Sequence, residues 1–314
     1  MPAAGDHDLG LAPEVEDLLT WLRVERGRSR NTLAAYRRDL DAYVRWLDVR
    51  GTTIGEVTEH DIVEYVAHLR HEGLAASSTK RALVSVRGLH RFLAEETEGR
   101  VDPAADVAMP KVPRGLPKAL SEDEVAYLLG IVVGDGPGER RDRAILEVLY
   151  GTGLRISELV GLSLSDLDLD AGLLRAFGKG SKERIVPLGR YALAALSAWL
   201  DPAGRERWEP DQWARRGDAE AVFLNTRGGR LSRQGAWMAV KRAGQLAGLD
   251  DRLSPHVLRH SCATHMLDHG ADIRTVQELL GHASISTTLV YTLVSTDRLV
   301  SVYRSAHPRA VAQD

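Results

Sequence analysis

Apolar residues recur every three or four positions through most of the first hundred residues. Between residues 30 and 50 they form one stripe: Leu33, Tyr36, Leu40, Tyr43, Val44 and Leu47. The same spacing returns at residues 59–71 and 77–95, and a segment near residues 13–26 completes the set. This spacing places side chains on one face of an α-helix. Residues 1–107 are therefore predicted to form a small helical domain.

A change of composition follows this domain. Residues 108–119 carry three prolines and a glycine, which break helices and predict an interdomain linker. The rest of the chain, residues 120–314, is predicted to form a second domain. Its two short apolar segments at 173–177 and 184–188 flank a glycine-containing turn and predict a β-hairpin.

Helical periodicity dominates the remainder of the second domain. It is found at residues 138–150, 155–161, 190–200, 232–247, 254–269, 272–280 and 284–292, with a short last segment near 295–305. The fold class predicted from these patterns is mainly α with a small β-sheet.

The composition is that of an ordinary globular protein. Of the 314 residues, 44% are hydrophobic and 27% are charged, which excludes disordered and collagen-like chains. The single cysteine, Cys262, cannot form an internal disulfide or a cysteine-rich zinc site and is expected in the core. No secretory signal or membrane-spanning run is visible, so we expect a cytoplasmic protein.

The formal net charge of −3 conceals four runs of basic residues. They lie at residues 23–38, 80–91, 175–190 and 227–242, and the acidic residues cluster elsewhere. Each run alone is typical of a solvated helix face, but together they indicate a surface that follows phosphates. The candidate DNA contacts from these runs and the linker are Arg28, Arg30, Lys80, Arg81, Arg87, Lys111, Lys182, Arg233 and Lys241.

Two motifs place a cation beside a glycine-rich turn. Arg155 follows Gly-Thr-Gly-Leu at a predicted helix start, where free backbone N–H groups and its guanidinium would suit a phosphate. The alternative is a structural pair with Glu158, three residues later. Lys179 lies in the turn Gly-Lys-Gly-Ser-Lys, which fails the Walker pattern. It would reach into a DNA groove or remain a solvated turn residue.

Two further motifs carry histidines. His256 and Arg259 are three residues apart on a predicted helix, so they share one face, where one can exchange a proton and the other hold an anion. Zinc is disfavoured there because the residue after His256 is not the glutamate of the zinc-protease pattern. His282 follows a helix end, and Tyr291 lies nine residues beyond it. A lone tyrosine on an apolar helix is more often a core residue.

Taken together, the order Arg, Lys, His-x-x-Arg, Gly-His, Tyr resembles the tyrosine recombinase family of DNA strand-exchange enzymes. The segments TGLRISEL, GKGSKERIVPL, HVLRHSCATHML and LLGHASISTTLVYT carry the resemblance, which extends over both domains. The linker and the ending AHPRA are most similar to the bacterial Xer type. The resemblance implies a helical, SAM-like core-binding domain and an α+β catalytic domain that close around duplex DNA as a C-shaped clamp.

The resemblance also implies a role for each motif residue. Tyr291 would attack a phosphodiester to give a 3′-phosphotyrosyl link, while Lys179 protonates the departing 5′-oxygen. Arg155, Arg259 and His282 would hold the phosphate. His256 would assist proton transfer, and Glu158 would orient its neighbours. This chemistry requires no cofactor and no metal.

The partners implied are a specific double-stranded DNA site, a homologous XerC- or XerD-type recombinase in a cyclic heterotetramer, and a septal DNA translocase of the FtsK type. The reaction would pass through a Holliday junction and resolve chromosome dimers at cell division. Two alternatives stay open: an integrase of a phage or mobile element, and a DNA-bending architectural protein that does not cut.

Overall fold

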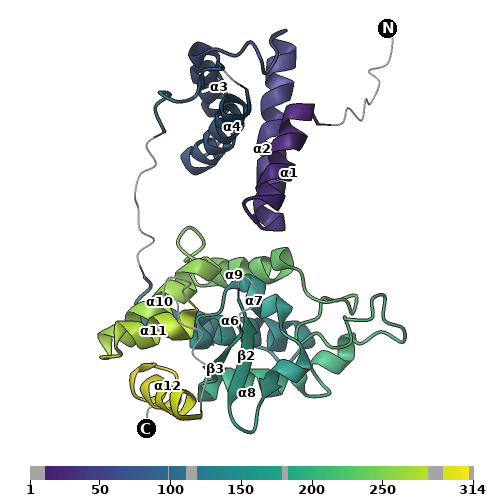
Figure 1. The fold of residues 1–314 in the computed structure, drawn as a ribbon. Coiled ribbons are helices and arrows are strands. Elements are labelled where there is room, and N and C mark those ends of the chain that lie inside the picture. The colour runs from purple at the N-terminus through teal and green to yellow at the C-terminus, as the bar shows by residue number, and fades with distance from the viewer. Residues whose placement is uncertain (1–10, 98, 111–118, 179–182, 282–292, 311–314) are drawn as a thin grey trace. The chain divides into compact units, whose positions relative to one another are not determined.

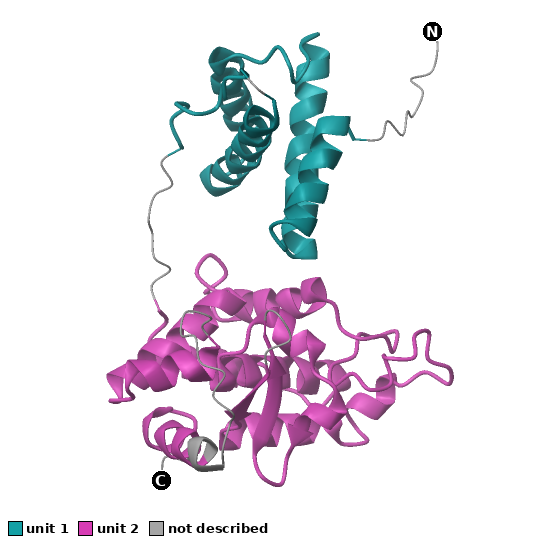
Figure 2. Cartoon of the chain, in the orientation of Figure 1, with its two compact units in different colours: residues 1–114 teal, residues 115–314 magenta. Residues whose placement is uncertain are grey.

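The structure, a computed structural model, describes residues 11–97, 99–110, 119–178, 183–281 and 293–310 (Figure 1). The chain divides into two compact units, Met1–Arg114 and Gly115–Asp314 (Figure 2). Within the described ranges no helix is long and apolar enough to cross a membrane.

In its described residues, unit 1 has four helices, α1 (Pro13–Val24), α2 (Arg30–Val49), α3 (Glu59–His71) and α4 (Ala76–Glu96). Local chemistry explains where two of them begin. The Ser29 hydroxyl accepts from the Thr32 N–H at the start of α2, and Thr58 and Asp61 form a capping box at the start of α3.

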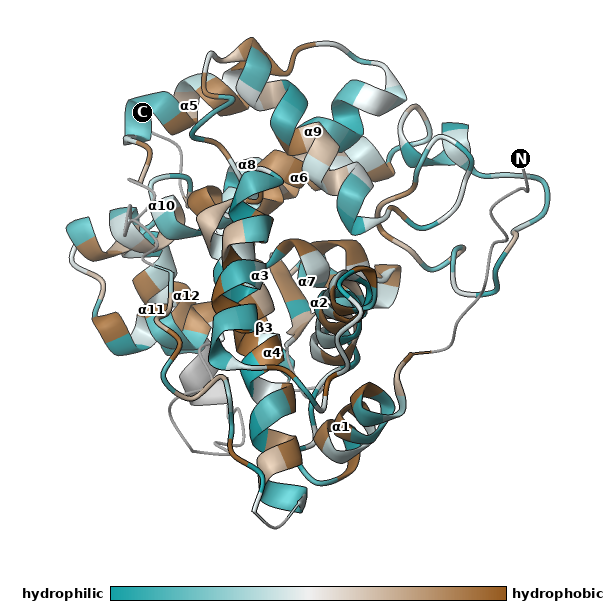
Figure 3. Ribbon diagram, turned by 90° about the horizontal axis from the view of Figure 1, so that it is seen from above, coloured by the Kyte–Doolittle hydropathy of each residue, from teal (hydrophilic) through white to brown (hydrophobic). Residues whose placement is uncertain are grey.

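The apolar stripes of unit 1 meet in one core. Leu40, Tyr43, Ile62, Leu83 and Leu89 are all fully buried there. The helices alternate hydrophobic and hydrophilic bands because one side of each faces this core (Figure 3). The predicted helical domain is confirmed.

Unit 2 is mainly helical around one small sheet. Its helices are α5 (Glu122–Ile131), α6 (Pro137–Thr152), α7 (Ile156–Gly161), α8 (Arg190–Leu200), α9 (Arg233–Leu246), α10 (Pro255–Asp268), α11 (Ile273–Leu280) and α12 (Leu293–Ala306), with short 3₁₀ turns at Leu164–Asp166 and Arg205–Trp208. The central helix is α6, whose residues from Ala144 to Thr152 are all buried and which packs against α8, α9 and α10.

The sheet has three antiparallel strands in the order β1 (Leu167–Asp168), β2 (Leu173–Phe177) and β3 (Glu183–Pro187). The predicted hairpin is β2–β3, with Leu174 opposite Val186. The short β1 was not predicted, because two residues are too few to show an alternating pattern. The helix predicted at 284–292 lies outside the described residues.

One buried histidine makes unit 1 sensitive to acid. His90 has no exposed surface and shares a 3.0 Å hydrogen bond with the Tyr43 hydroxyl. Burial lowers the pKa of His90 to about 4. The unfolded chain binds this proton below about pH 6.5, whereas the folded chain does not until about pH 4.

We therefore expect the free energy of unfolding to fall as the pH drops from about 6.5 to 4, by about 2 kcal/mol at pH 5 for this group. Urea unfolding at each pH, monitored by amide hydrogen exchange in α4, measures this free energy. His90→Gln should flatten this dependence, whereas His60→Gln, at an 80% exposed side chain, should not. An equally steep dependence in His90→Gln would contradict the assignment.

Candidate active site

The glycine-rich turn after α6 positions Arg155. Gly153 ends α6 with φ +61°, in the left-handed region that favours glycine. A Cβ at this residue would lie 2.5 Å from Leu280 Cδ2, so a glycine here also leaves space for the Leu280 side chain at the end of α11. The chain then turns through Leu154, and Arg155 stands directly before α7.

Arg155 is paired and exposed at the same time. Its Nη1 donates to Glu158 Oε1 at 2.8 Å, and its backbone N–H donates to Glu158 Oε2 at 2.9 Å. The structural pair weighed from the sequence is therefore present, and the Glu158 carboxylate also occupies one N–H of the turn, that of Arg155. Even so, 42% of the Arg155 side chain is exposed, so the guanidinium remains accessible to an anion.

Arg259 on α10 is held from two sides. It is only 7% exposed. Its Nη1 donates to the Gly153 carbonyl at 2.5 Å and its Nη2 to the Leu280 carbonyl at 2.6 Å. These bonds tie α10 to the turn of Arg155 and to the end of α11. His256 lies three residues earlier on α10 and is exposed.

A third arginine, Arg184, belongs to the same cluster but was not among the site residues predicted from the sequence. It lies on β3, is 5% exposed, and donates through Nη1 and Nη2 to the two Glu158 oxygens at 3.1 and 2.8 Å. Its Nε donates to the Leu279 carbonyl at 2.8 Å. A sequence signal exists, because strand alternation places Arg184 on the same face as the buried Val186.

The cluster carries more positive than negative charge. Burial alone would raise the pKa of Glu158, but hydrogen bonds and charge from Arg184, then Arg155, outweigh it and lower that pKa. Burial, followed by repulsion from Arg155, lowers the pKa of Arg259 to about 10. Arg259 therefore keeps its charge at neutral pH, and the cluster sets three arginines against one carboxylate. This surplus favours an anion beside Arg155 and Arg259.

The end of α11 completes the described part of the site. Gly281 ends this helix with φ +67°, and its carbonyl accepts from Arg155 Nη2 at 3.3 Å. The next residue in the chain is His282. The residues His282, Tyr291, Lys179, Lys182 and Lys111 lie outside the described part of the chain. The structure thus brings together Arg155, Glu158 and Arg259 of the predicted set, with His256 one turn from Arg259.

The candidate DNA contacts fall into two groups. The first consists of exposed residues near helix starts: Arg28, Arg30, Lys80 and Arg233. The second consists of side chains already bonded to the protein: Arg81, Arg87 and Lys241.

Arg81 donates from Nε and Nη2 to the buried Asp39 at 3.1 and 3.0 Å. Its basic run contains no acidic residue, but the fold supplies one from α2. Arg87 donates to the carbonyls of Ala104, Ala105 and Val107, so it fastens the end of unit 1. Lys241 donates to the Asp250 carbonyl. These bonds give the three side chains contacts within their own units, while 54% of the Arg81 side chain stays exposed, so Arg81 remains a candidate DNA contact.

Two further histidines at the end of α10, His265 and His269, already have partners inside the protein. His265 is buried, and its Nδ1 and Nε2 are each 2.8 Å from a partner, the Tyr150 hydroxyl and the Leu120 carbonyl. His269 Nδ1 lies 3.0 Å from the Ala306 carbonyl. No group of three metal-ligating side chains is found among the described residues. Cys262 is fully buried, as expected.

Comparison with known proteins gives matches along nearly the whole chain. The model of the phage integrase family matches residues 118–298, and that of the phage integrase N-terminal SAM-like domain matches residues 15–97. The chain is 49% identical over 312 residues to tyrosine recombinase XerD of Mycobacterium tuberculosis strain H37Rv, covering 96% of this chain and 99% of that one. It is 48% identical over 301 residues to tyrosine recombinase XerD of Corynebacterium glutamicum, covering 93% and 97%.

Among solved structures, a lambda integrase dimer bound to a COC′ core site has the same fold. The TM-score is 0.65 at 21% identity, covering 86% of this chain and 94% of that chain. The arginine cluster, the two family models and the relatives that match nearly the full length of the chain all indicate the same family. The chain belongs to the phage integrase family and is a site-specific tyrosine recombinase of the Xer type.

Proposed function

We propose that this recombinase cuts and rejoins DNA through a 3′-phosphotyrosyl intermediate and a Holliday junction, and that it resolves chromosome dimers at cell division. The observation that carries the chemical part is the pair of arginines, Arg155 and Arg259, braced by carbonyls and Glu158 in a site with surplus positive charge. The biological part is supported by the relatives named XerD.

In this proposal the Tyr291 oxygen attacks phosphorus and displaces the 5′-oxygen of the next nucleotide. Arg155 and Arg259 neutralise the non-bridging oxygens, whose charge is greatest in the pentacoordinate transition state. His282 donates to the same phosphate. Because hydrogen bonds within the protein already hold Arg155 and Arg259, these two donors require little reorganisation during the reaction.

Protons must be transferred both when the strand is cut and when it is rejoined. Lys179 protonates the departing 5′-oxygen, and His256, on the same helix as Arg259, accepts the proton that Tyr291 loses. In the rejoining step the 5′-hydroxyl attacks the phosphotyrosine and each proton returns. A phenolate is a good leaving group, so the covalent bond stores the energy of the cut strand.

Glu158 supports this chemistry without touching DNA. Its two oxygens hold Arg155 on one side and Arg184 on the other. Removing one partner of such a buried pair leaves an uncompensated charge, so the three side chains act as a unit.

The partners follow from the same proposal. Both units would contact a specific duplex, with exposed Arg28, Arg30, Lys80 and Arg233 contacting phosphates. A homologous XerC-type partner would complete a cyclic heterotetramer, and an FtsK-like septal DNA translocase would activate it. The reaction would take place on the chromosome in the bacterial cytoplasm.

A nicked duplex tests the proposal. With a nick just beyond the cut, the short strand carrying the 5′-hydroxyl diffuses away and the covalent complex accumulates. We expect a shifted protein band that survives denaturation on duplexes carrying a chromosome-dimer-resolution site, and none on a scrambled duplex. Binding and bending with no trapped complex, with or without the partner recombinase, would instead support an architectural protein.

A further inference from the structure

The helix that follows Arg155 is short. α7 has six residues, which make it about 9 Å long. A helix of this length has little stability of its own, so the contacts at its two ends decide how it lies. Its first turn is held in the candidate active site, where Glu158 accepts from Arg155 and Arg184. The contacts at the other end of α7 therefore bear on where the Arg155 side chain lies.

Arg230 holds the C-terminal end of α7. Its Nη1 donates to the carbonyls of Val160, Gly161 and Leu162 at 3.2, 2.9 and 2.8 Å. Its Nη2 donates to Ser163 Oγ at 3.1 Å. The last carbonyls of a helix have no partner within the helix, and the helix dipole favours a cation beside them. One guanidinium thus satisfies the end of α7 and the residues directly after it.

Arg230 is itself fixed by the segment that carries it. Its backbone N–H donates to Oδ1 of Asp218 at 3.1 Å, and Asp218 is only 8% exposed. Arg230 also pairs with Leu224 in an antiparallel bridge. Its Nη2 donates to the Gly217 carbonyl at 3.2 Å. The guanidinium is therefore held at a defined place, and it fastens α7 to residues 217–230, which lie far from α7 in the sequence.

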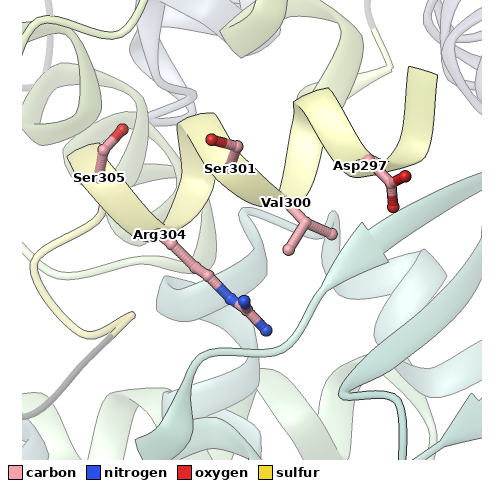
Figure 4. A pocket seen from close by; sticks show the side chains of 5 residues that line it. All are labelled: Asp297, Val300, Ser301, Arg304 and Ser305. Atoms are coloured by element: carbon pink, nitrogen blue, oxygen red, sulfur yellow. The ribbon is translucent and has the colours of Figure 1, made fainter. Parts of the chain in front are cut away.

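Arg230 differs from a surface arginine in what its guanidinium binds. Arg304 on α12 is exposed and lines an open pocket of about 530 Å³ (Figure 4). The other residues that line this pocket are Asp297, Val300, Ser301 and Ser305. The Arg230 guanidinium instead donates to carbonyls and a hydroxyl. Its basic run, residues 227–242, suggested phosphate contacts, but this member of the run binds the protein's own backbone.

We propose that Arg230 is a positioning residue that holds α7 in the orientation in which Arg155 binds the phosphate. This rests on the proposed function, in which Arg155 neutralises a non-bridging oxygen. Arg155 stands directly before α7 and Glu158 lies on it, so a tilt of the C-terminal end of this short helix moves both side chains. In this proposal Arg230 contacts neither DNA nor the reacting atoms and acts through Arg155.

The proposal predicts that loosening the end of α7 slows the chemical step and spares DNA binding. We expect Arg230→Ala in the full chain to slow covalent trapping on saturating nicked duplex by about 10-fold, because Arg155 is then misplaced. DNA affinity should stay within about twofold, because the charge of Arg155 remains. Arg230→Lys, which keeps a cation beside the α7 carbonyls, should recover part of the rate and serves if Arg230→Ala does not fold.

A second background separates positioning of Arg155 from a general loss of structure. In Arg155→Ala there is no guanidinium left to position. Adding Arg230→Ala to that variant should therefore slow trapping by no more than about twofold further. A general loss of structure would instead add the full factor in both backgrounds. Accumulation of the trapped complex over hours measures these slow rates.

Arg205 supplies the matched control. It is 5% exposed and donates to the carbonyls of Ala221 and Ala219 at 3.0 and 2.6 Å. It thus fastens the same part of unit 2 as Arg230, but its hydrogen bonds within the described chain do not reach α7. Arg205→Ala should lower the urea midpoint of unfolding at least as much as Arg230→Ala and still trap DNA at the parent rate. Arg304→Ala, at the open pocket, should leave the urea midpoint unchanged.

The outcomes are distinct. Trapping at the parent rate in Arg230→Ala would overturn the proposal. An equal loss of rate in Arg205→Ala would also overturn it, as would a full additional loss when Arg230→Ala is added to Arg155→Ala. Trapping at the parent rate in Arg155→Ala alone would instead overturn the proposed function, whatever the behaviour of the Arg230 variants.

Discussion

Replacing Tyr291 with phenylalanine is expected to abolish the covalent protein–DNA complex and to leave DNA affinity within about twofold of that of the parent chain. The change removes one oxygen atom and no positive charge, whereas affinity for duplex DNA comes chiefly from contacts between cations and phosphates. The phenol oxygen of Tyr291 is the nucleophile in the proposed reaction, so without it the protein forms no covalent bond to phosphorus. Trapping on nicked duplex and a binding titration on the same duplex measure the two effects.

The structure weakens the case for two other tyrosines of unit 2, Tyr150 and Tyr303. Burial raises the pKa of Tyr150 and of Tyr303, and both hydroxyls are already bonded inside the protein. A nucleophile needs a hydroxyl that loses its proton readily and reaches solvent, and Tyr150 and Tyr303 fail both conditions.

Tyr127 supplies the matched control. It is 60% exposed on α5, so Tyr127→Phe removes an accessible phenol from the same unit. This variant should trap DNA at the parent rate. Digestion of the trapped complex should give one nucleotide-bearing peptide, the one that contains Tyr291. Mapping the link to any other residue would remove Tyr291 from its assigned role.

Much of the fold could be predicted because the apolar spacing that indicates a helix lies within a short stretch of sequence. The stripe containing Leu40 and Tyr43 was visible at spacings of three and four, and the structure buries both residues. The β2–β3 hairpin was equally visible, because a glycine-containing turn separates two short apolar segments. These signals depend on neighbours within a few residues, so one sequence is enough to find them.

The parts that escaped prediction depend on contacts between distant segments. Arg184 meets Glu158 across 26 positions of sequence, and Arg81 meets Asp39 across 42. A basic run without local acid looked free for DNA, yet the fold brought a carboxylate to it. The bond from the Arg155 N–H to Glu158 is a different case, because it spans only three residues and was missed although the glycine pattern before it was recognised.

The second large effect on covalent trapping is expected at Arg259, whose guanidinium donates to the Gly153 and Leu280 carbonyls. Arg259→Lys is expected to slow covalent trapping by about 10²–10³-fold, the effect of removing one fixed donor from an oxyanion site. DNA affinity should change far less, because the positive charge remains. Lysine has one nitrogen, so it cannot bond the Gly153 and Leu280 carbonyls together and still present a planar fork to a phosphate.

The neighbouring residue separates this effect from damage to α10. His260 is exposed beside Arg259, and His260→Ala should trap DNA at the parent rate. Because Arg259 ties α10 to the Arg155 turn, its loss should also make Arg155 less effective. The double variant Arg155→Lys with Arg259→Lys should then lose less than the product of the two single losses. Fully multiplicative losses would mean that the two arginines act independently, and that the carbonyl bracing between them contributes to folding and not to the chemistry.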